Sequence, residues 1–232
     1  IAASTTLTLT MGAKVAAGTT QSTSPDVVNI TGSLGEAGAT TLVRGGTLAV
    51  AGAPGGATQT ANTLKVLGNT LLSSVTLTGG AGGTAAGGAL TVEFGDATTD
   101  TFNVTGLTLT GGAADAASDT AGGAVTSTVT AAATIGATGI TMQGGAGANS
   151  AVGGAVTLTF ANGATIGGAV SVTAGNTDTG AGGDATLNFD GTTTSTSTLT
   201  IKGGTTGTDL ALVTVSGDAT FTAITLDEVG AA

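Results

Sequence analysis

The chain lacks the side chains on which most catalytic and metal-binding sites depend. It contains no cysteine, histidine, tryptophan or tyrosine, and aromatic residues make up only 2% of its 232 residues. Without histidine and cysteine there is no Ser-His or Cys-His nucleophile, and no imidazole or thiolate ligand for a transition metal. We therefore expect a protein that is not an enzyme and that carries no organic cofactor.

Charged residues are scarce as well. Asp, Glu, Lys and Arg together make up 8% of the chain, whereas soluble domains average about 25%. The cations are Lys14, Arg44, Lys65 and Lys202, and the net charge is −10. Four scattered cations cannot neutralise a phosphate backbone or an anionic membrane surface, so neither is expected as a partner. No run of about 18 apolar residues occurs, so no membrane-spanning helix is expected.

Glycine, alanine, threonine and aliphatic residues dominate instead. There are 43 glycines but only 2 prolines, and 40% of the residues are hydrophobic. Disordered chains are poor in apolar residues and rich in charge, so this composition is not that of a disordered chain. Because the branched side chains of Val, Ile and Thr fit a pleated surface, the composition predicts an all-β fold.

A short phrase that reads apolar, Thr, apolar, polar, Gly recurs with small variations. Its alternation with period two predicts a strand with one buried face. Five clear copies start 29 to 33 residues apart, at Val75, Leu107, Ile140, Val170 and Leu199. Three weaker copies, which start at Leu7, Val28 and Leu48, precede them at shorter spacings.

Each clear copy is followed by a second alternating phrase, which predicts a second strand in every unit. These second phrases start at Leu90, Val125, Val156, Ala185 and Ala211. A third phrase is shorter and fainter: Thr101-Phe102, Thr134-Ile135, Thr165-Ile166 and Thr220-Phe221. The unit that starts at Val170 has only a Thr/Ser run at that place.

Aligned on these phrases, the units form columns of like residues. One predicted inward column contains three of the five phenylalanines: Phe94, Val129, Phe160, Phe189 and Val215. Stacked parallel strands about 4.8 Å apart generate such columns. The sequence therefore predicts a single-domain parallel β-helix (β-solenoid) of about eight coils, and chain chirality favours right-handed winding. Residues 75–226 are expected to form the regular coils, residues 1–74 narrower coils with a candidate donor strand, and residues 227–232 a tail.

A β-sandwich is the alternative fold, because alternating strands also build two packed antiparallel sheets. The two folds differ in strand pairing. A solenoid places Thr108 parallel between Thr76 and Thr141, whereas a sandwich pairs it antiparallel with a neighbour.

Glycine pairs flank the predicted strands. Gly111-Gly112 follows a first strand and Gly122-Gly123 precedes a second strand, and equivalent pairs recur in the other units. Two roles are expected for them: corners that need a positive φ, and close approach of stacked backbones.

The segments GGALTVEF, GGAVTSTV and GGAVTLTF resemble the Gly-Gly-Ala-apolar repeats of polymorphic outer-membrane autotransporter passengers. The Thr/Gly/Ala repetition is also similar to that of large bacterial adhesins and surface-layer proteins. The resemblance covers residues 75–221 and implies a parallel β-helix exposed at a bacterial cell surface. An extracellular location is therefore expected.

Acidic loop residues are the candidates for metal binding. Asp115 and Asp119 share one Gly/Ala loop, and Asp178 and Asp184 share the next loop but one. Calcium binds several oxygens, which carboxylates and loop carbonyls supply together, so these four aspartates are the candidate calcium ligands. Because these carboxylates cluster weakly, solubilising surface charge is the expected role and calcium binding is the alternative.

One acidic cluster is the candidate for acid/base chemistry. Glu93 points outward from its predicted strand, with Asp96 and Asp100 close in sequence. A polysaccharide-active β-helix would use such carboxylates, but a group of solvated surface charges is the more frequent outcome for so small a cluster.

Both ends of the chain alternate like strands, in IAASTTLTLTMGAKV and in ATFTAITLDEV. Open strand edges are templates for another chain. We therefore predict a structural subunit that polymerises head to tail, through end-to-end β-strand contacts, into a surface filament or layer. An adhesin-type passenger domain that binds a surface ligand is the alternative. A third interpretation is ice binding by outward Thr-x-Thr rows such as Thr76/Thr78 and Thr108/Thr110, which Gln143 and Lys202 interrupt.

Overall fold

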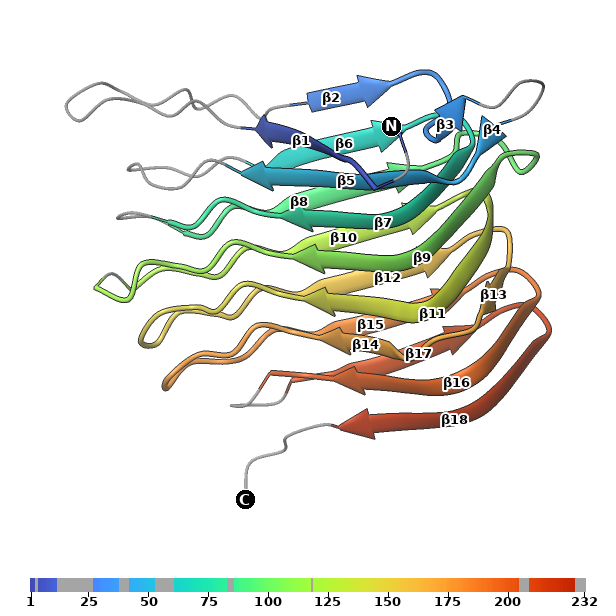
Figure 1. Ribbon diagram of the computed structural model, residues 1–232. Coiled ribbons are helices and arrows are strands. Elements are labelled where there is room, and N and C mark those ends of the chain that lie inside the picture. Colours follow the sequence, from blue (N-terminus) through green and yellow to red (C-terminus); the bar gives the residue numbers. More distant parts are fainter. Residues whose placement is uncertain are drawn as a thin grey trace.

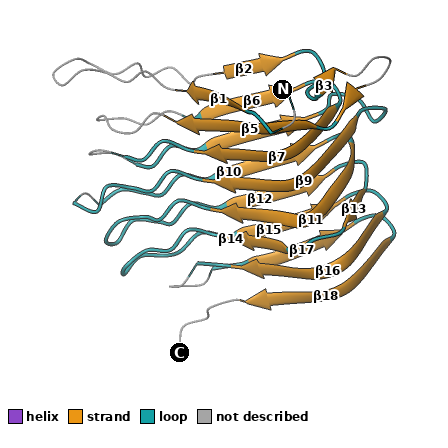
Figure 2. Cartoon of the chain, in the orientation of Figure 1, coloured by secondary structure: helices purple, strands orange, loops and turns teal. Residues whose placement is uncertain are grey.

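The computed structural model is a β-solenoid of stacked parallel strands (Figure 1). It describes residues 1–2, 4–11, 27–37, 42–52, 61–82, 86–117, 119–204 and 209–227. Within these residues all regular structure is strand (Figure 2). No helix that could cross a membrane occurs in this part of the chain.

Two parallel sheets, sheet A and sheet B, form the walls of the solenoid. In the described residues, sheet A holds nine strands: β1 (Thr6–Met11), β5 (Gly45–Gly52), β7 (Thr70–Thr78), β9 (Thr101–Thr110), β11 (Ala132–Gln143), β13 (Ala164–Ile166), β14 (Val170–Thr173), β16 (Thr193–Lys202) and β18 (Ala219–Asp227). Sheet B holds seven: β2 (Val27–Ile30), β6 (Asn62–Val66), β8 (Leu90–Phe94), β10 (Val125–Val129), β12 (Val156–Phe160), β15 (Ala185–Phe189) and β17 (Ala211–Val215). A small antiparallel pair is formed by β3 (Glu36–Ala37) and β4 (Leu42–Val43).

Along the chain, sheet A and sheet B strands alternate. From β7 to β17 this alternation makes five regular turns, in which β13 and β14 together serve as one sheet A strand. Thr108 lies parallel between Thr76 and Thr141, so the solenoid is confirmed and the β-sandwich alternative is wrong.

The predicted inward columns lie between the two sheets. Val75, Leu107, Ile140, Val170 and Leu199 pair in direct register, and each is at most 1% exposed. Since burying one such side chain contributes about 1.5–3 kcal/mol, stacking several columns over successive coils supplies the main stabilisation of the fold. A single coil would leave these residues exposed to water, because they are covered by the strands of the coils above and below.

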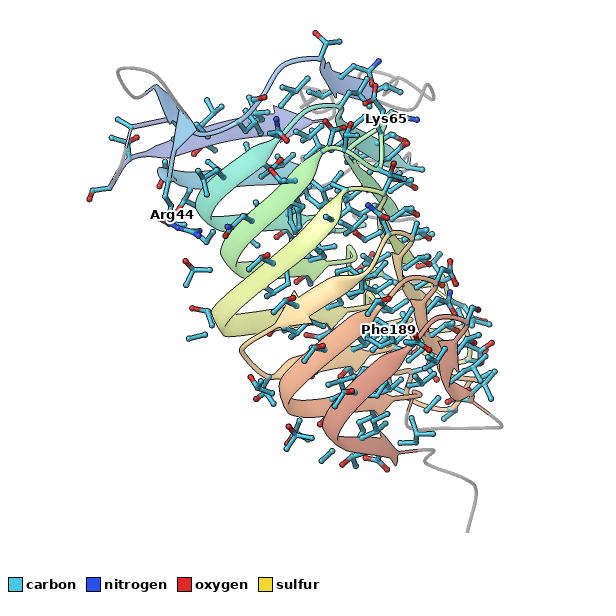
Figure 3. All side chains as sticks on the ribbon, turned by 90° about the vertical axis from the view of Figure 1, so that its right-hand side faces the viewer. Arg44, Lys65 and Phe189 are labelled. Atoms are coloured by element: carbon cyan, nitrogen blue, oxygen red, sulfur yellow. The ribbon has the colours of Figure 1, made fainter. Side chains whose placement is uncertain are left out.

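The phenylalanine column is confirmed as well. Phe94, Val129 and Phe160 lie in register on adjacent strands, and both phenylalanines are fully buried. Phe160 and Phe189 stack with ring centroids 5.6 Å apart and ring planes 5° from parallel. Phe189 points into the interior, whereas Arg44 and Lys65 lie on the outer surface (Figure 3).

The third phrase lies in sheet A, where it opens the long, bent strands that the next first phrase completes (Figure 1). In one coil the two phrases form separate strands, β13 and β14. The predicted alignment of the third phrase is wrong by two residues in one unit: Phe102 pairs with Ala133, and Val104 pairs with Ile135. A shift of two residues keeps every side chain on its face, so alternation alone cannot detect it. The Thr/Ser run also forms a strand here, with Ser195 buried in register with Ile166.

One of the weaker copies of the first phrase lies in sheet B and not with the other copies in sheet A, so its predicted place in the series is wrong. Val28 and Ile30 lie in sheet B, where they pair with Leu64 and Val66. The other two weaker copies, at Leu7 and Leu48, pair with each other in sheet A. The spacing in residues 1–74 is short because the three copies come from strands of both sheets.

The glycine pairs serve close backbone contact and not corners. The described glycines with positive φ are Gly95, Gly139 and Gly163, none of which belongs to a pair that flanks a strand. Hydrogen bonds instead zigzag between the chain segments that leave sheet A and those that enter sheet B. We call the following set the glycine seam: Gly88, Gly112, Gly123, Gly145 and Gly154. From Gly112 onward, the backbone N of each residue donates a hydrogen bond to the carbonyl of the residue named before it, at 2.8–3.0 Å.

A side chain has no room in the seam. A Cβ on Gly112 or Gly145 would lie 1.9 Å from a backbone oxygen of a neighbouring segment, and one on Gly123 would lie 2.2 Å away. Close approach is therefore the confirmed role of these glycines, and the positive-φ role is wrong for them.

Candidate functional site

The first candidate site consists of the loops that carry Asp115 and Asp119, between β9 and β10. The Asp119 carboxylate accepts hydrogen bonds from the backbone N and the Oγ of Ser150 in the next coil, at 2.8–3.1 Å. Asp115 Oδ1 accepts a hydrogen bond from the backbone N of Ala117 at 3.2 Å. These contacts give both carboxylates a structural role within and between the stacked loops.

The second pair of predicted ligands lies between β14 and β15. Asp178 is exposed, and Asp184 Oδ1 accepts a hydrogen bond from the backbone N of Leu210 at 2.9 Å. In the described residues no group of three or more His, Cys, Asp or Glu side chains lies together as a metal site. Surface charge therefore stays the prediction for the four aspartates, and calcium binding stays the alternative.

Asp209 is a buried carboxylate that sequence reasoning missed. It is 8% exposed, and within the described part of the chain its Oδ2 has no hydrogen-bond partner. Asp209 stands two residues before β17, at the place where Gly183 precedes β15 and Gly154 precedes β12. This break in the glycine pattern is the signal that would have singled it out.

The acid/base candidates have structural partners. Glu93 forms an ion pair with Lys65 at 2.6 Å, and the two side chains are 32% and 41% exposed. Asp100 Oδ2 accepts hydrogen bonds from the backbone N of Asp96 and of Ala97, at 3.2 and 3.1 Å. The three residues therefore form two separate structures. Glu93 makes a surface ion pair between adjacent strands, and Asp100 holds the turn between β8 and β9 by accepting backbone hydrogen bonds.

The other cations also have acceptors. Arg44 spans the outer face of sheet A, where its guanidinium donates to the carbonyl of Leu72 and to Asn103 Oδ1 (Figure 3). Lys202 forms an ion pair with Asp227 at 2.9 Å. Lys14 lies outside the described residues.

An open groove of about 560 Å³ lies on the outside of the solenoid. Most of its lining is hydroxyl and carboxamide side chains: Ser33, Asn69, Thr99, Thr101, Asn103 and Thr134. Asn69 Oδ1 accepts hydrogen bonds from both the backbone N and the Oγ of Thr101, at 2.8 and 3.0 Å. The lining side chains themselves are uncharged, and Asn103 Oδ1 accepts a hydrogen bond from Arg44. Such a set of donors and acceptors suits a polyhydroxylated ligand.

The outward threonines of sheet A form the predicted column. Thr76, Thr108, Thr141, Ser171 and Thr200 lie in direct register on successive strands. In the neighbouring row, Gln143 and Lys202 replace threonine. Ice binding by these rows stays a prediction.

The two ends of the solenoid (Figure 1) expose large apolar side chains. At the C-terminal face, formed by β17 and β18, Val215 and Ile224 are each 42% exposed and Leu226 is 50% exposed. At the N-terminal face, formed by β1 and β2, Leu7 is 38% and Val27 is 56% exposed. All four strands are sheet edges within the described residues. Apolar side chains beside unpaired backbone are typical of an association surface.

Comparison with known proteins identifies no relative. The chain matches no family model, no curated protein and no solved structure.

Proposed function

We propose that the chain is a non-catalytic structural subunit of a bacterial cell-surface filament or layer, and that it extends by end-to-end contacts between parallel strands. The observation that carries the proposal is the exposure of the C-terminal face. Ile224 and Leu226 continue two columns whose inner members, such as Leu199 and Ile201, are fully buried. A strand placed over β18 would complete the same contacts that stabilise every inner coil.

Backbone chemistry favours the same contact. Among the described residues, the outer edges of β17 and β18 have no neighbouring strand, so their outward N–H and C=O groups gain partners when a parallel strand is added. A hydrogen bond of this kind contributes about 0.5–1.5 kcal/mol, and several form together. Because the two faces are different surfaces, head-to-tail contact is heterologous and produces an open filament.

The subunit is a short rod in this proposal. Sheet A has strands at eight successive positions, which supports about eight coils and a length of about 35–40 Å at 4.8 Å per coil. Right-handed winding is part of the proposal, from the chirality of parallel strand connections.

Electron microscopy of the purified chain tests the proposal. We expect filaments or sheets built from rods, and we expect Leu226→Lys to abolish them because it places a charge in the column at the joint. The matched control is Thr225→Lys, which adds the same charge to the outward row of the same strand. Isolated rods at high protein concentration would refute the proposal.

An adhesin-type function is the second candidate, and the polar groove supports it. Its hydroxyl and carboxamide lining suits a neutral glycan at a surface. A glycan array with the wild-type chain and Asn103→Ala tests this function. Binding that the substitution removes, together with monomeric rods in the microscope, would place the adhesin function first. Neither function requires calcium at the four loop aspartates.

A further inference from the structure

The two ends of the solenoid are out of phase by half a coil. The described strands alternate between sheets A and B, but the series opens with β1 and closes with β18, and both belong to sheet A. A strand that continues the series after β18 must therefore lie in sheet B, against β17. The first described strand of an incoming copy of residues 1–232 is again a sheet A strand. The described strands of two copies consequently cannot join with both sheets continuous, because β18 and the incoming β1 need the same position.

We infer that β1 is a removable cap, and that joining exchanges it for β18 of the neighbouring copy. In the joint, β2 of the incoming copy pairs with β17, and β5 of the incoming copy pairs with β18. The incoming β1 leaves the edge of β5. This inference rests on the proposed end-to-end assembly and specifies its partner strands and the step that regulates it.

The inward columns match across this joint. Extending the observed registers places Val28 of the incoming copy over Val213, and its Ile30 over Val215. In sheet A the same extension places the incoming Leu48 over Ile224. Each contact sets an aliphatic residue on an aliphatic residue, as in the inner coils.

The outward face of sheet B supplies an independent match. Its inner coils carry a column of threonines: Thr63, Thr91, Thr126, Thr157 and Thr186. The column turns apolar only at the two ends of the described sheet, with Val27 in β2 and Leu212 in β17, which are 56% and 39% exposed. The proposed joint puts these two side chains side by side. An outward aliphatic pair of this kind stabilises a strand pair, whereas each alone is exposed to water.

β1 is the weaker of the two competing strands. It pairs with β5 over six residues, and Leu7 and Thr8 are exposed. β18 spans nine residues, packs Phe221 against Phe189 with ring centroids 5.1 Å apart, and ends in the Lys202–Asp227 ion pair. When β18 takes the place of β1 on β5, Ile224 and Leu226 replace Leu7 and Leu9 over the same two columns. The exchange keeps β5 paired over the same columns and gains the pairing of β17 with β2. It also releases Ile1, which packs against the core and accepts a hydrogen bond from the backbone N of Gly46.

Keeping β1 in place has a structural penalty. If the incoming β1 paired with β18, sheet B would lack one strand between β17 and the incoming β2. The backbone groups of both edges and the inward side chains Val213 and Val215 would then face a gap inside the joint. Buried unpaired backbone groups are strongly disfavoured, so the exchange is the better joint.

Disulfide locks test the exchange, because the chain contains no cysteine of its own. Thr8→Cys with Ala49→Cys joins β1 to β5 at paired, outward positions. The matched control, Thr200→Cys with Thr225→Cys, joins β16 to β18 in the same outward column. Paired strands about 4.8 Å apart lie within the span of about 4.4–6.8 Å that a disulfide bridges. Light scattering and electron microscopy follow assembly of each purified protein, oxidised and reduced.

We expect the oxidised β1 lock to lose assembly and to regain it on reduction, whereas the β18 lock assembles like the wild type in both states. Assembly of the oxidised β1 lock at the wild-type rate would overturn the inference and leave the structural function intact. A block by the β18 lock alone would also overturn it, because β18 would then be the strand that leaves. If no variant and no wild-type protein assembles, the proposed function fails as well.

A cross-link identifies the neighbours in the joint. Val27 and Leu212 are six strand spacings apart in one copy, about 29 Å, which is too far for a disulfide. Val27→Cys with Leu212→Cys should therefore give ladders of covalent oligomers. Val27→Cys with Thr186→Cys is the control and should not, because Thr186 stays inside the subunit. Ladders from the control pair alone would overturn the proposed register.

Discussion

Replacing Gly145 by alanine tests whether the glycine seam holds the coils together. Gly145 is buried, and a Cβ built on it would lie 1.9 Å from the carbonyl oxygen of Gly112 and 2.7 Å from the backbone N of Gly123. Both obstacles are backbone atoms that the seam's own hydrogen bonds hold in place. A flexible side chain could turn aside, but these atoms move only if stacked segments separate.

The cost follows from two effects. Inserting a methyl group into a packed region costs about 1–3 kcal/mol. Separating the segments also weakens the hydrogen bonds that Gly145 makes, at 2.9 Å to Gly123 and at 2.8 Å from Gly154, and each buried group left without a partner costs about 1–3 kcal/mol. Alanine restricts the unfolded chain and returns about 0.4–1 kcal/mol. We expect the free energy of unfolding to fall by about 3–5 kcal/mol.

Urea unfolding followed by far-ultraviolet circular dichroism measures this change, since the chain has no tryptophan or tyrosine to report by fluorescence. The matched control is Gly167→Ala. Gly167 lies outside the seam, is exposed, and would place its Cβ no closer than 3.4 Å to another atom. We expect this control to change stability by less than about 1 kcal/mol. If both variants unfold at the same urea concentration, the seam does not depend on the absence of side chains.

Three further experiments probe the core, the surface charges and the loops. Phe160→Ala should lower the free energy of unfolding by about 3–5 kcal/mol, because it opens a cavity against Phe189. Thr157→Ser on the same strand is the control and should have little effect. Equal shifts in urea unfolding would mean that the column is loosely packed. Glu93→Gln should cost less than about 1 kcal/mol, since its ion pair with Lys65 is partly exposed, and a larger loss in the same assay would show an unrecognised partner. Calcium should leave the thermal unfolding midpoint unchanged, because Asp119 is already bonded across the coils; a calcium-dependent rise that Asp119→Asn removes would reveal a metal site.

Much of the architecture is predictable from local pattern and period. Alternation decides which side chains face inward, and the repeat near 30 residues decides which of them stack. For this reason the Thr76–Thr108–Thr141 pairing and the Phe94–Val129–Phe160 column are both confirmed. The failures share one cause. Alternation has a period of two, so it cannot separate Phe102 from Val104 in register, nor a sheet A strand from a sheet B strand at Val28.

The candidate sites were predictable only as residue types. The sequence placed aspartates in neighbouring loops, but whether a carboxylate meets a cation, a serine or a backbone amide depends on the loop of the next coil. Asp119 therefore bonds to Ser150, which lies 31 residues away in the chain. Asp209 went unnoticed because burial of a single carboxylate is set by the segments stacked around it.

The sequence by itself determined the strand faces, the column composition and the parallel stacking, because each depends on periods that can be read along one chain. The tertiary structure alone decided the phase between the two sheets. That phase depends on how many strands each sheet receives, and it leaves β1 and β18 in the same sheet at opposite ends. The role of the glycine pairs also became visible only in the tertiary structure. A Cβ on Gly112 or Gly145 would lie 1.9 Å from a backbone oxygen of another coil, so only glycine fits. This distance between coils depends on the stacking and cannot be read from one segment.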